Sequence, residues 1–380
     1  MSDFIYADHA ATTPLSSHAL EAMMPYLTEQ FGNPSSIYAP GRRARRAVDQ
    51  SREIVAAAFG AQPSEIYFTS GGTESDNWAI RAAAELGGET KKHLITSSVE
   101  HHAVLHTFQN MRRRGYETTI LDVDERGNIP IEKLREAVRE DTALVSIMAA
   151  NNEVGTIMPV AEIGVAAHEA GAVFHTDAVQ AAGHIPIDVD KMGIDMMSFS
   201  AHKFGGPKGI GGLFVRKGLR VGQGLFGGGQ EHGMRSGTEN VAGIVGLAAA
   251  LNESCKMMKE NTEKVAGMRD RLIKGVLQIP GSHLTGEPKN RLPGSASFTF
   301  DGMEGEALVL LLDQNGICAS SGSACSAGAL EPSHVLLAMG LSHEAARGSL
   351  RLTLGVDNTD AEIDEILKKL PQIIARLRNV

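Results

Sequence analysis

The sequence predicts an α/β protein, with a large domain built on a mostly parallel seven-stranded sheet and a smaller α/β domain. Short β-rich runs alternate with helical stretches from about residue 64 to residue 217, which is typical of a parallel sheet covered by helices. The chain has 380 residues, 42% of them hydrophobic and 21% charged, enough to bury a large core. The predicted strands lie within residues 64–71, 93–98, 117–123, 142–151, 172–178, 196–202 and 211–217.

The second domain is predicted beyond a glycine-rich stretch at residues 222–229. A long helical region from about residue 240 to 277 bridges the two domains, and strands alternate with helices after it. The strands lie within residues 295–302, 316–323 and 349–355, and the helices within 304–314, 332–340 and 359–378. We therefore expect a large domain over residues 16–255 and a small domain made of residues 1–15 and 256–380.

The bulk composition argues against several classes of protein. Lys plus Arg number 36 against 45 Asp plus Glu, a formal net charge of -9, so a broad surface for nucleic acid or an anionic membrane is not expected. The amino terminus resembles neither a signal nor a transit peptide, and no apolar run reaches the ~18 residues of a membrane span, so we expect a soluble cytoplasmic protein. Three cysteines are too few for a disulfide framework or a four-ligand zinc site.

Lys203 is a candidate Schiff-base lysine. In MMSFSAHKFGGPKG it follows a strand and precedes two glycines and a proline, which force a turn and leave room for a flat ring. The competing interpretation is a surface lysine in a loop. By composition alone three other lysines are equal candidates: Lys191, Lys208 and Lys217.

Asp177 ends a buried apolar strand in AVFHTDAVQ, where a lone carboxylate is costly without a partner. The protonated pyridine nitrogen of pyridoxal phosphate (PLP) is such a partner, because the ion pair keeps the nitrogen protonated and lets the ring absorb carbanion charge. Gln180, three residues later, is placed to bond the phenolic oxygen of the ring. The competing interpretation is an Asp that caps the next helix.

A phosphate site is predicted in TSGGTESDNWAI. This segment is a strand, a turn that ends in Gly72, and a helix that Thr73 opens with Asp76 as its capping partner. Backbone N–H groups at a helix N-terminus bind phosphate, but any capped helix after a tight turn has this pattern. Ser200 and His202, which lie beside the candidate lysine, would complete the site.

Three histidines follow another strand in SSVEHHAVLH: His101, His102 and His106. At the carboxyl end of a strand, His101 can stack on a cofactor ring and shuttle protons. A metal site is the alternative, since His102 and His106 are spaced i, i+4 on one helical face, but no third ligand is placed by spacing. We expect no metal and structural roles for these two.

Arg351 lies in SLRLTLG, where leucines at alternate positions face the core and Arg351 faces away from it. A planar guanidinium binds an amino-acid carboxylate through two parallel hydrogen bonds, which Lys does not. Asn152, in AANNEVG, is a candidate for the same pocket. An ordinary surface arginine is an equally good interpretation.

Cys325 is the candidate reactive thiol. In ASSGSACSAGALEP it is surrounded by Ser, Gly and Ala, which pack little and leave a loop accessible. Cys318 lies in a predicted apolar strand and Cys255 in a helical stretch, so we expect both to be inert.

Ten segments in order resemble the cysteine desulfurases of iron–sulfur cluster assembly and nitrogen fixation, within the class V aminotransferase group of PLP enzymes. The resemblance covers nearly the whole chain, and it implies the type I fold of PLP-dependent transferases. The segments are YADHAATTP, FGNPSS, GGTES, EHHAV, NNEVG, HTDAVQ, SAHKFGGPKG, RSGTEN, SSGSAC and LRLTLG.

The resemblance also implies roles for single residues. The implied catalytic residues are Cys325, Lys203 and His101. The implied PLP-binding residues are Gly72, Thr73, Asp177, Gln180, Ser200, His202 and, across the subunit boundary of an obligate homodimer, Thr238. The implied substrate-binding residues are Asn152, Arg351 and Asn33.

The implied reaction converts L-cysteine to L-alanine and leaves the sulfur as a persulfide on Cys325, for an acceptor such as an iron–sulfur scaffold or a sulfur-carrier protein. The segment SSGSACSAGALEPSHVL resembles the members with a long catalytic loop. Three alternatives stay open: a selenocysteine lyase or cysteine sulfinate desulfinase on the same scaffold, a histidine-based metallohydrolase, and a sulfur-transfer scaffold without PLP. Lys203, Asp177 and Cys325 together argue against the last.

Overall fold

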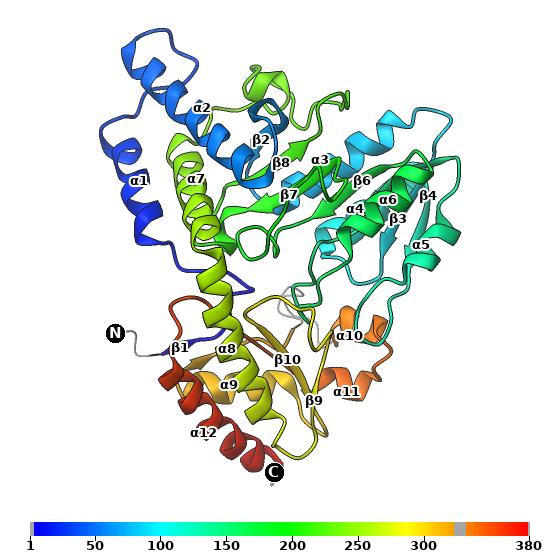
Figure 1. Ribbon diagram of the computed structural model, residues 1–380, viewed down its shortest axis with the longest axis vertical. Coiled ribbons are helices and arrows are strands. Elements are labelled where there is room, and N and C mark those ends of the chain that lie inside the picture. The colour runs from blue at the N-terminus through cyan, green and yellow to red at the C-terminus, as the bar shows by residue number, and fades with distance from the viewer. Residues whose placement is uncertain (1–3, 323–331, 379–380) are drawn as a thin grey trace.

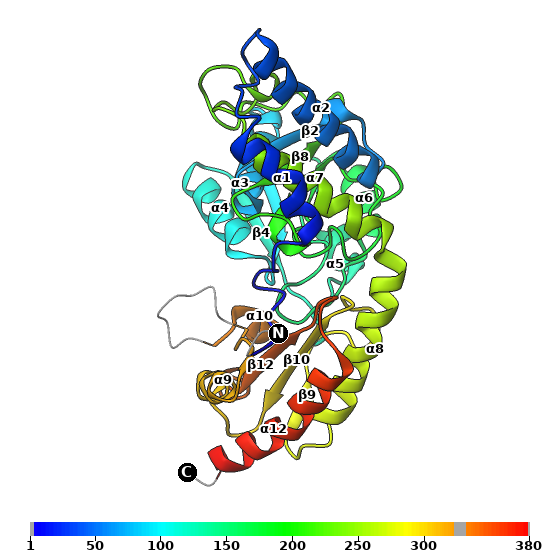
Figure 2. The same ribbon diagram turned by 90° about the vertical axis from the view of Figure 1, so that its left-hand side faces the viewer.

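Figures 1 and 2 show an elongated molecule of two lobes, in a computed structural model that describes residues 4–322 and 332–378. The first lobe contains a seven-stranded sheet and the second a three-stranded sheet. Helices α7 (Val241–Lys256) and α8 (Met258–Val276) follow each other along the molecule and connect the lobes. The predicted long helical region is thus two helices that meet at Met257.

The seven-stranded sheet has the strand order β2-β8-β7-β6-β5-β3-β4. β8 pairs antiparallel with both of its neighbours, and every other pair is parallel. The predicted mostly parallel seven-stranded sheet is therefore confirmed. The strands are β2 (Ile66–Thr69), β3 (His93–Ser97), β4 (Glu117–Leu121), β5 (Thr142–Ser146), β6 (Val173–Asp177), β7 (Met196–Ser200) and β8 (Gly211–Val215).

Helices cover both faces of this sheet because both faces are apolar. Successive strand residues point to opposite faces, so Leu144 of β5 joins the core under α3 and α4, while Val145 joins the core under α2, α6 and α7. The helices of this lobe are α1 (Ser17–Thr28), α2 (Ala39–Phe59), α3 (Gly72–Leu86), α4 (His102–Arg113), α5 (Ile131–Ala137) and α6 (Val160–Glu169).

The second lobe has an antiparallel sheet of order β12-β10-β9, whose core includes Phe298, Leu350 and Ile366. A separate parallel pair joins β1 to β11. The strands are β1 (Ile5–Tyr6), β9 (Ser282–Leu284), β10 (Ser295–Phe300), β11 (Ile317–Cys318) and β12 (Ser349–Thr353), and the helices are α9 (Gly305–Gln314), α10 (His334–Ala338), α11 (His343–Arg347) and α12 (Asp360–Arg378).

The division into residues 16–255 and residues 1–15 with 256–380 stays a proposal. The core of the second lobe draws Ala7 together with residues between Val265 and Ile374, as this division requires. Val335 and Leu336 of α10, however, join the core of the first lobe. Among the described residues, no helix is long and apolar enough to cross a membrane.

A buried ion pair between Arg52 of α2 and Glu231 supports one edge of the first lobe. The guanidinium donates to both carboxylate oxygens at 2.8 and 2.7 Å and to the carbonyl oxygen of Ile66 at 2.6 Å, and the backbone N–H of Phe68 donates to Glu231 at 2.8 Å. Both side chains are almost fully buried, so the loss of either one would leave the other charge buried without a partner.

We expect Arg52→Met to lower the free energy of unfolding by about 3–5 kcal/mol, because it leaves the Glu231 carboxylate buried without a counter-charge. Urea unfolding would show a lower midpoint at an unchanged slope. The matched control is Arg271→Met, which removes an exposed guanidinium that bonds Asp360 and Asp364. Equal midpoints for the two variants would contradict the prediction.

Candidate active site

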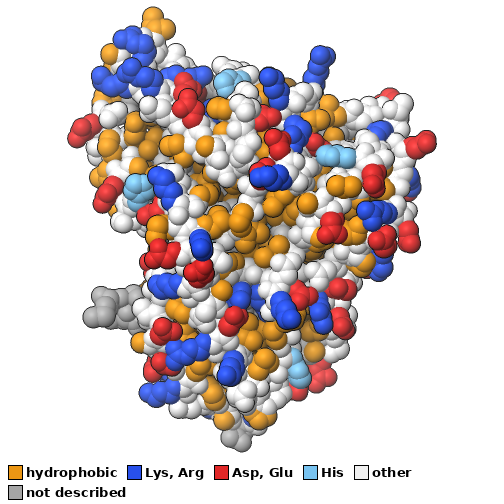
Figure 3. Space-filling model, viewed as in Figure 1, with side chains coloured by type: hydrophobic (Ala, Val, Ile, Leu, Met, Phe, Trp, Pro, Cys, Tyr) orange, Lys and Arg blue, Asp and Glu red, His pale blue; other side chains and the backbone are white. Residues whose placement is uncertain are grey.

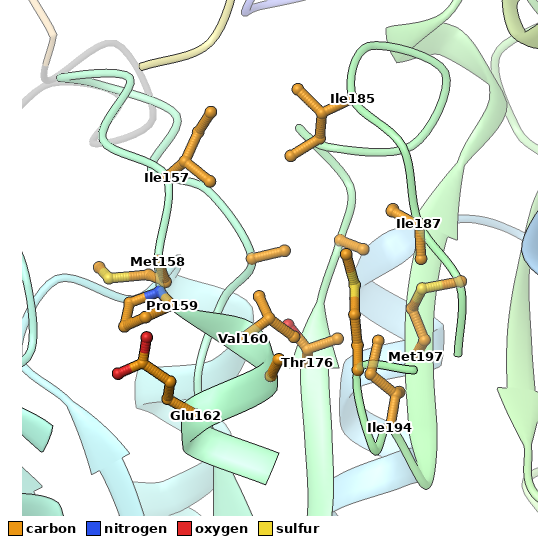
Figure 4. A pocket seen from close by; sticks show the side chains of 14 residues that line it. Ile157, Met158, Pro159, Val160, Glu162, Thr176, Ile185, Ile187, Ile194 and Met197 are labelled. Carbon is orange, nitrogen blue, oxygen red and sulfur yellow. The ribbon is translucent and has the colours of Figure 1, made fainter. Parts of the chain in front are cut away.

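Two cavities at the seven-stranded sheet differ in chemistry. One, of about 220 Å³, lies between the start of α6 and strands β6 and β7, and its lining is apolar apart from Glu162 and Thr176 (Figure 4). On the face of the molecule seen in Figure 1, hydrophobic side chains gather across the middle (Figure 3). The other, of about 340 Å³, brings together Lys203, Asp177 and His101. Acid–base chemistry needs converging titratable groups, so we place the candidate active site in the second cavity.

The strand order explains why these side chains converge. Residues that follow the carboxyl ends of parallel strands meet at one edge of the sheet, where ligands bind in such folds. The cavity is lined by residues at or just beyond the carboxyl ends of β2 (Gly72, Thr73, Asp76), β3 (His101), β5 (Met148, Ala150, Asn152), β6 (Asp177, Val179, Gln180) and β7 (Ser200, His202, Lys203), together with Ala10, Ala11, Gly322 and Arg351.

Lys203 ends a short 3₁₀ helix (Ala201–Lys203) directly after β7. Its Nζ donates to the carbonyl oxygens of Ala10 and Ala11 at 2.5 and 2.9 Å, and His184 donates to its backbone oxygen at 2.8 Å. The amino-terminal segment therefore forms part of the wall against which the amine is held.

Asp177 is buried at the floor of the cavity. Burial raises its pKa to about 6, although the backbone N–H of Val179 donates to its carboxylate at 2.9 Å. Gln180 also lines the cavity, and its side chain donates to the Ala10 oxygen at 3.0 Å. The carboxylate thus sits where a buried cation would be its natural partner.

Asp76 is a second buried carboxyl group in the same cavity. Burial and the charge of Asp177 raise its pKa well above the usual range, and its Oδ1 has no hydrogen-bond partner among the described residues. The nearby His175 ring, 3.7 Å from this oxygen, has a pKa lowered by burial to about 3 and is neutral. The sequence predicted Asp76 only as a capping partner, since an acid three residues after Thr73 has that signature.

At the phosphate end of the cavity, the structure differs from the prediction in where helix α3 begins. α3 begins at Gly72 with Gly71 at its cap, so Thr73 lies inside the first turn and does not open the helix. The reason is backbone conformation: Gly71 has φ +152°, which side chains disfavour, and a Cβ at Gly72 would lie 2.6 Å from Val179. Thr73, Ser200 and His202 all line the cavity, and their binding of a phosphate stays a prediction.

His101 caps α4, with its Nδ1 accepting the backbone N–H of Ala103 at 3.1 Å. Burial, then the Lys203 charge, lowers its pKa to about 4, so the ring is neutral near pH 7. With Nδ1 accepting, the single proton is assigned to Nε2. The rings of His102 and His106 stack with their centroids 5.1 Å apart. No group of three or more possible metal ligands occurs in the described part of the chain.

Arg351 is buried rather than a surface residue, because the face of β12 opposite the leucines lines the cavity. Its guanidinium donates to Asp8 at 2.9 Å and to the backbone oxygen of Asn152 at 2.9 Å, and its Nε has no hydrogen-bond partner among the described residues. The surface interpretation is thus wrong. Sequence reasoning missed Asp8, whose only signal was its place in the YADHAATTP segment.

Two predicted residues do not line the cavity of their own chain. Asn33 is exposed and accepts the backbone N–H of Ser35 at 2.9 Å, and Thr238 is exposed beside a separate small cavity. Cys325 lies outside the described residues.

The sequence matches the aminotransferase class-V family over residues 5–366, so the chain belongs to that family. The cysteine desulfurase IscS of Methanosarcina thermophila is 52% identical, covering 99% of this chain and 93% of the relative. The IscS of Clostridium botulinum is 49% identical, covering 100% and 96%. The resemblance to the cysteine desulfurases is therefore confirmed.

Solved structures agree with this grouping. The structure of a NifS-like protein has a TM-score of 0.93 at 40% identity, covering 98% of this chain and 100% of that chain. The structure of SspA in complex with cysteine has a TM-score of 0.83 at 38% identity, covering 93% and 100%. The predicted type I fold is confirmed by these likenesses.

Proposed function

We propose that this chain is a PLP-dependent cysteine desulfurase that converts L-cysteine to L-alanine and holds the sulfur as a persulfide on Cys325. One observation carries the proposal: the Lys203 amine, the buried Asp177 carboxylate and the Arg351 guanidinium line a single cavity at the carboxyl edge of the sheet. The relatives named cysteine desulfurase support the same reaction.

The cavity residues fit PLP. Asp177 is a buried carboxylate suited to a protonated ring nitrogen, and the glycine-capped start of α3 leaves room for a phosphate beside Thr73 and Ser200. When bound, PLP supplies an electron-withdrawing ring that stabilises negative charge at the substrate α-carbon. We assign Lys203 to the covalent link, Gln180 to the phenolic oxygen and His202 to the phosphate.

We assign each remaining residue a separate role in the reaction. Arg351 and Asn152 hold the substrate carboxylate, and the Lys203 amine takes the proton from the α-carbon. His101, which is neutral, would hold its proton at Nε2 for transfer to the substrate. The Cys325 thiolate attacks the substrate sulfur, the carbon–sulfur bond breaks with its electron pair left on carbon, and protonation of that carbon gives alanine.

We propose a homodimer as the working form. Thr238 and Asn33 lie outside the cavity of their own chain, so they reach a cofactor site only if it belongs to a second copy. Large exposed apolar side chains near both residues support this: Phe31 is 81% exposed, Ile37 89% and Phe226 82%. The sulfur acceptor, a scaffold or carrier protein, and the cytoplasmic location stay predictions.

The test of the function is product analysis. Purified yellow protein given L-cysteine should release alanine and sulfide in equal amounts when a reductant is present. Selenocysteine and cysteine sulfinate, supplied separately, distinguish the two related activities, because their products are selenide and sulfite. A chain that releases alanine only from one of these substrates would contradict the desulfurase proposal.

We expect the affinity of the PLP-free protein for PLP to fall as the pH drops through about 6. Asp177 has its pKa raised to about 6 by burial, so below this pH it gains a proton and loses its attraction for the protonated ring nitrogen. Absorbance titrations between about pH 5 and 8 measure this step. Asp177→Asn should bind weakly throughout and keep only the titration of the phosphate. If the PLP affinity of the wild type and of Asp177→Asn changed with pH in the same way, the assignment of Asp177 to the ring nitrogen would be contradicted.

A further inference from the structure

The upstream end of the segment that carries Cys325 is held by β12. The backbone of Ser320 exchanges two hydrogen bonds with that of Arg351, at 3.1 and 2.6 Å, and Ser349 Oγ donates to the Ser321 oxygen at 2.7 Å. The described chain leaves this strand at Gly322, which lines the candidate active site together with Arg351.

The downstream end is held by a different part of the fold. Ser333 Oγ donates to Glu153 Oε2 and accepts the backbone N–H of Leu336 at 3.2 Å, which caps α10. Glu153 belongs to the connection between β5 and α6, in the first lobe. The two ends of the segment are therefore anchored to different lobes.

Glu153 lies against the upstream end as well. A Cβ built on Gly322 would be 3.3 Å from Glu153 Oε2, so this oxygen lies beside the upstream end, and it accepts the Ser333 hydroxyl of the downstream end. Gly322 also has φ +77°, which favours glycine at this close approach. The carboxyl group of Glu153 is thus bonded to the downstream end and lies next to the upstream end.

Glu153 is buried on a hydrogen-bonded stretch of backbone, where an ionised carboxyl group is costly. The side chain is 6% exposed, and Asn151 Oδ1 accepts the backbone N–H of Glu153 at 2.9 Å while Asn151 Nδ2 donates to the Val99 oxygen at 2.9 Å. Burial raises the pKa of Glu153 to about 7, and the Ser333 hydrogen bond and the charge of Arg351 offset part of that effect. The proposed reaction, as assigned above, gives this buried acid no role.

We propose that Glu153 is a positioning residue for the sulfur-transfer step, which holds the downstream end of the Cys325 segment at the β5–α6 connection, beside the upstream end, and so sets the reach of the thiol into the substrate pocket. The inference rests on the proposed function, in which the thiolate attacks the substrate sulfur. It concerns only that attack, because Glu153 is not among the residues that line the cavity.

The test separates the attack from the chemistry that precedes it. Glu153→Ala is expected to lower kcat for alanine formation by about 10- to 100-fold, since displacement of a reacting group by about 1 Å costs that much. Its KM should be unchanged. In a Cys325→Ala background, the change in the cofactor spectrum on L-cysteine addition should be as fast with Glu153→Ala as without it.

Three further variants define the contact. Glu153→Gln should restore most of kcat, because an amide oxygen accepts the Ser333 hydroxyl. Ser333→Ala should lower kcat in the same way, and the double variant Glu153→Ala/Ser333→Ala should be no slower than the slower single variant. The matched control is Glu162→Gln, which neutralises an exposed carboxylate on α6 and should leave kcat unchanged.

Different results overturn the inference in recognisable ways. A raised KM with a slowed spectral change would show that Glu153 acts on the substrate through Arg351. An unchanged kcat in Glu153→Ala, or fully additive losses in the double variant, would show that the contact does not position the thiol. A wild-type protein that forms no alanine from L-cysteine would refute the proposed function, and the inference with it.

Discussion

Lys203→Ala is expected to lower alanine formation from L-cysteine by a factor on the order of 10³ or more, because the variant loses the amine that we propose both as the covalent anchor of PLP and as the group that moves the α proton. The cofactor should then be bound only non-covalently and be lost on gel filtration. In the wild type, borohydride reduction followed by peptide mass mapping should locate PLP on Lys203. The amine is already held at the cavity wall by the Ala10 and Ala11 carbonyl oxygens.

The control for this prediction is Lys208→Ala. Lys208 follows the same strand five positions later in the chain, but it is exposed and does not line the cavity. It should retain wild-type activity and cofactor content. Recovery of the reduced cofactor on Lys208 would mean that the wrong lysine has been assigned.

Cys325→Ala is expected to abolish the release of both alanine and sulfide while the protein stays yellow and its spectrum still responds to L-cysteine. The reason is that the thiol enters only after the substrate is activated, so its removal blocks the breaking of the carbon–sulfur bond alone. Persulfide on the wild-type protein, detected by mass spectrometry after L-cysteine addition, should be absent from the variant.

The other two cysteines provide the control for the thiol assignment. Burial raises the pKa of both Cys255 and Cys318, which leaves less of the reactive thiolate at neutral pH. Cys255→Ala and Cys318→Ala should therefore form persulfide at the wild-type rate. Persulfide retained in Cys325→Ala and lost in either of these would reassign the nucleophile.

The large sheet was predictable because its strands carry their own signal. Runs such as HLITSS and MMSFSAH are apolar and bounded by turns, and the residues that follow them meet at one edge in any parallel sheet. Lys203, Asp177 and His101 could thus be grouped before their distances were known. β9 and β1 were missed because strands of three and two residues leave no periodic pattern.

The rest of the site depends on contacts between distant segments. Asp76 looked like a capping residue, since nothing local shows that it lines the same cavity as Asp177 and lies within reach of its charge. For Arg351 a surface position and a position in the pocket were equally good interpretations, because alternation in β12 identifies a second face but not what covers it. Here Asp8 and Asn152 cover it, and they come from segments more than a hundred residues away in the sequence.

With Arg351 as the proposed ligand of the substrate carboxylate, its contact with Asp8 makes substrate binding an exchange of anions. Before L-cysteine arrives, the guanidinium is already bonded to a carboxylate at 2.9 Å, so the substrate carboxylate must either displace Asp8 or share the arginine with it. The binding free energy that an experiment measures then reflects the difference in free energy between the Arg351–substrate ion pair and the Arg351–Asp8 ion pair. Small anions in the buffer compete in the same exchange, and an enzyme built this way discriminates among carboxylates by how well each replaces its own aspartate.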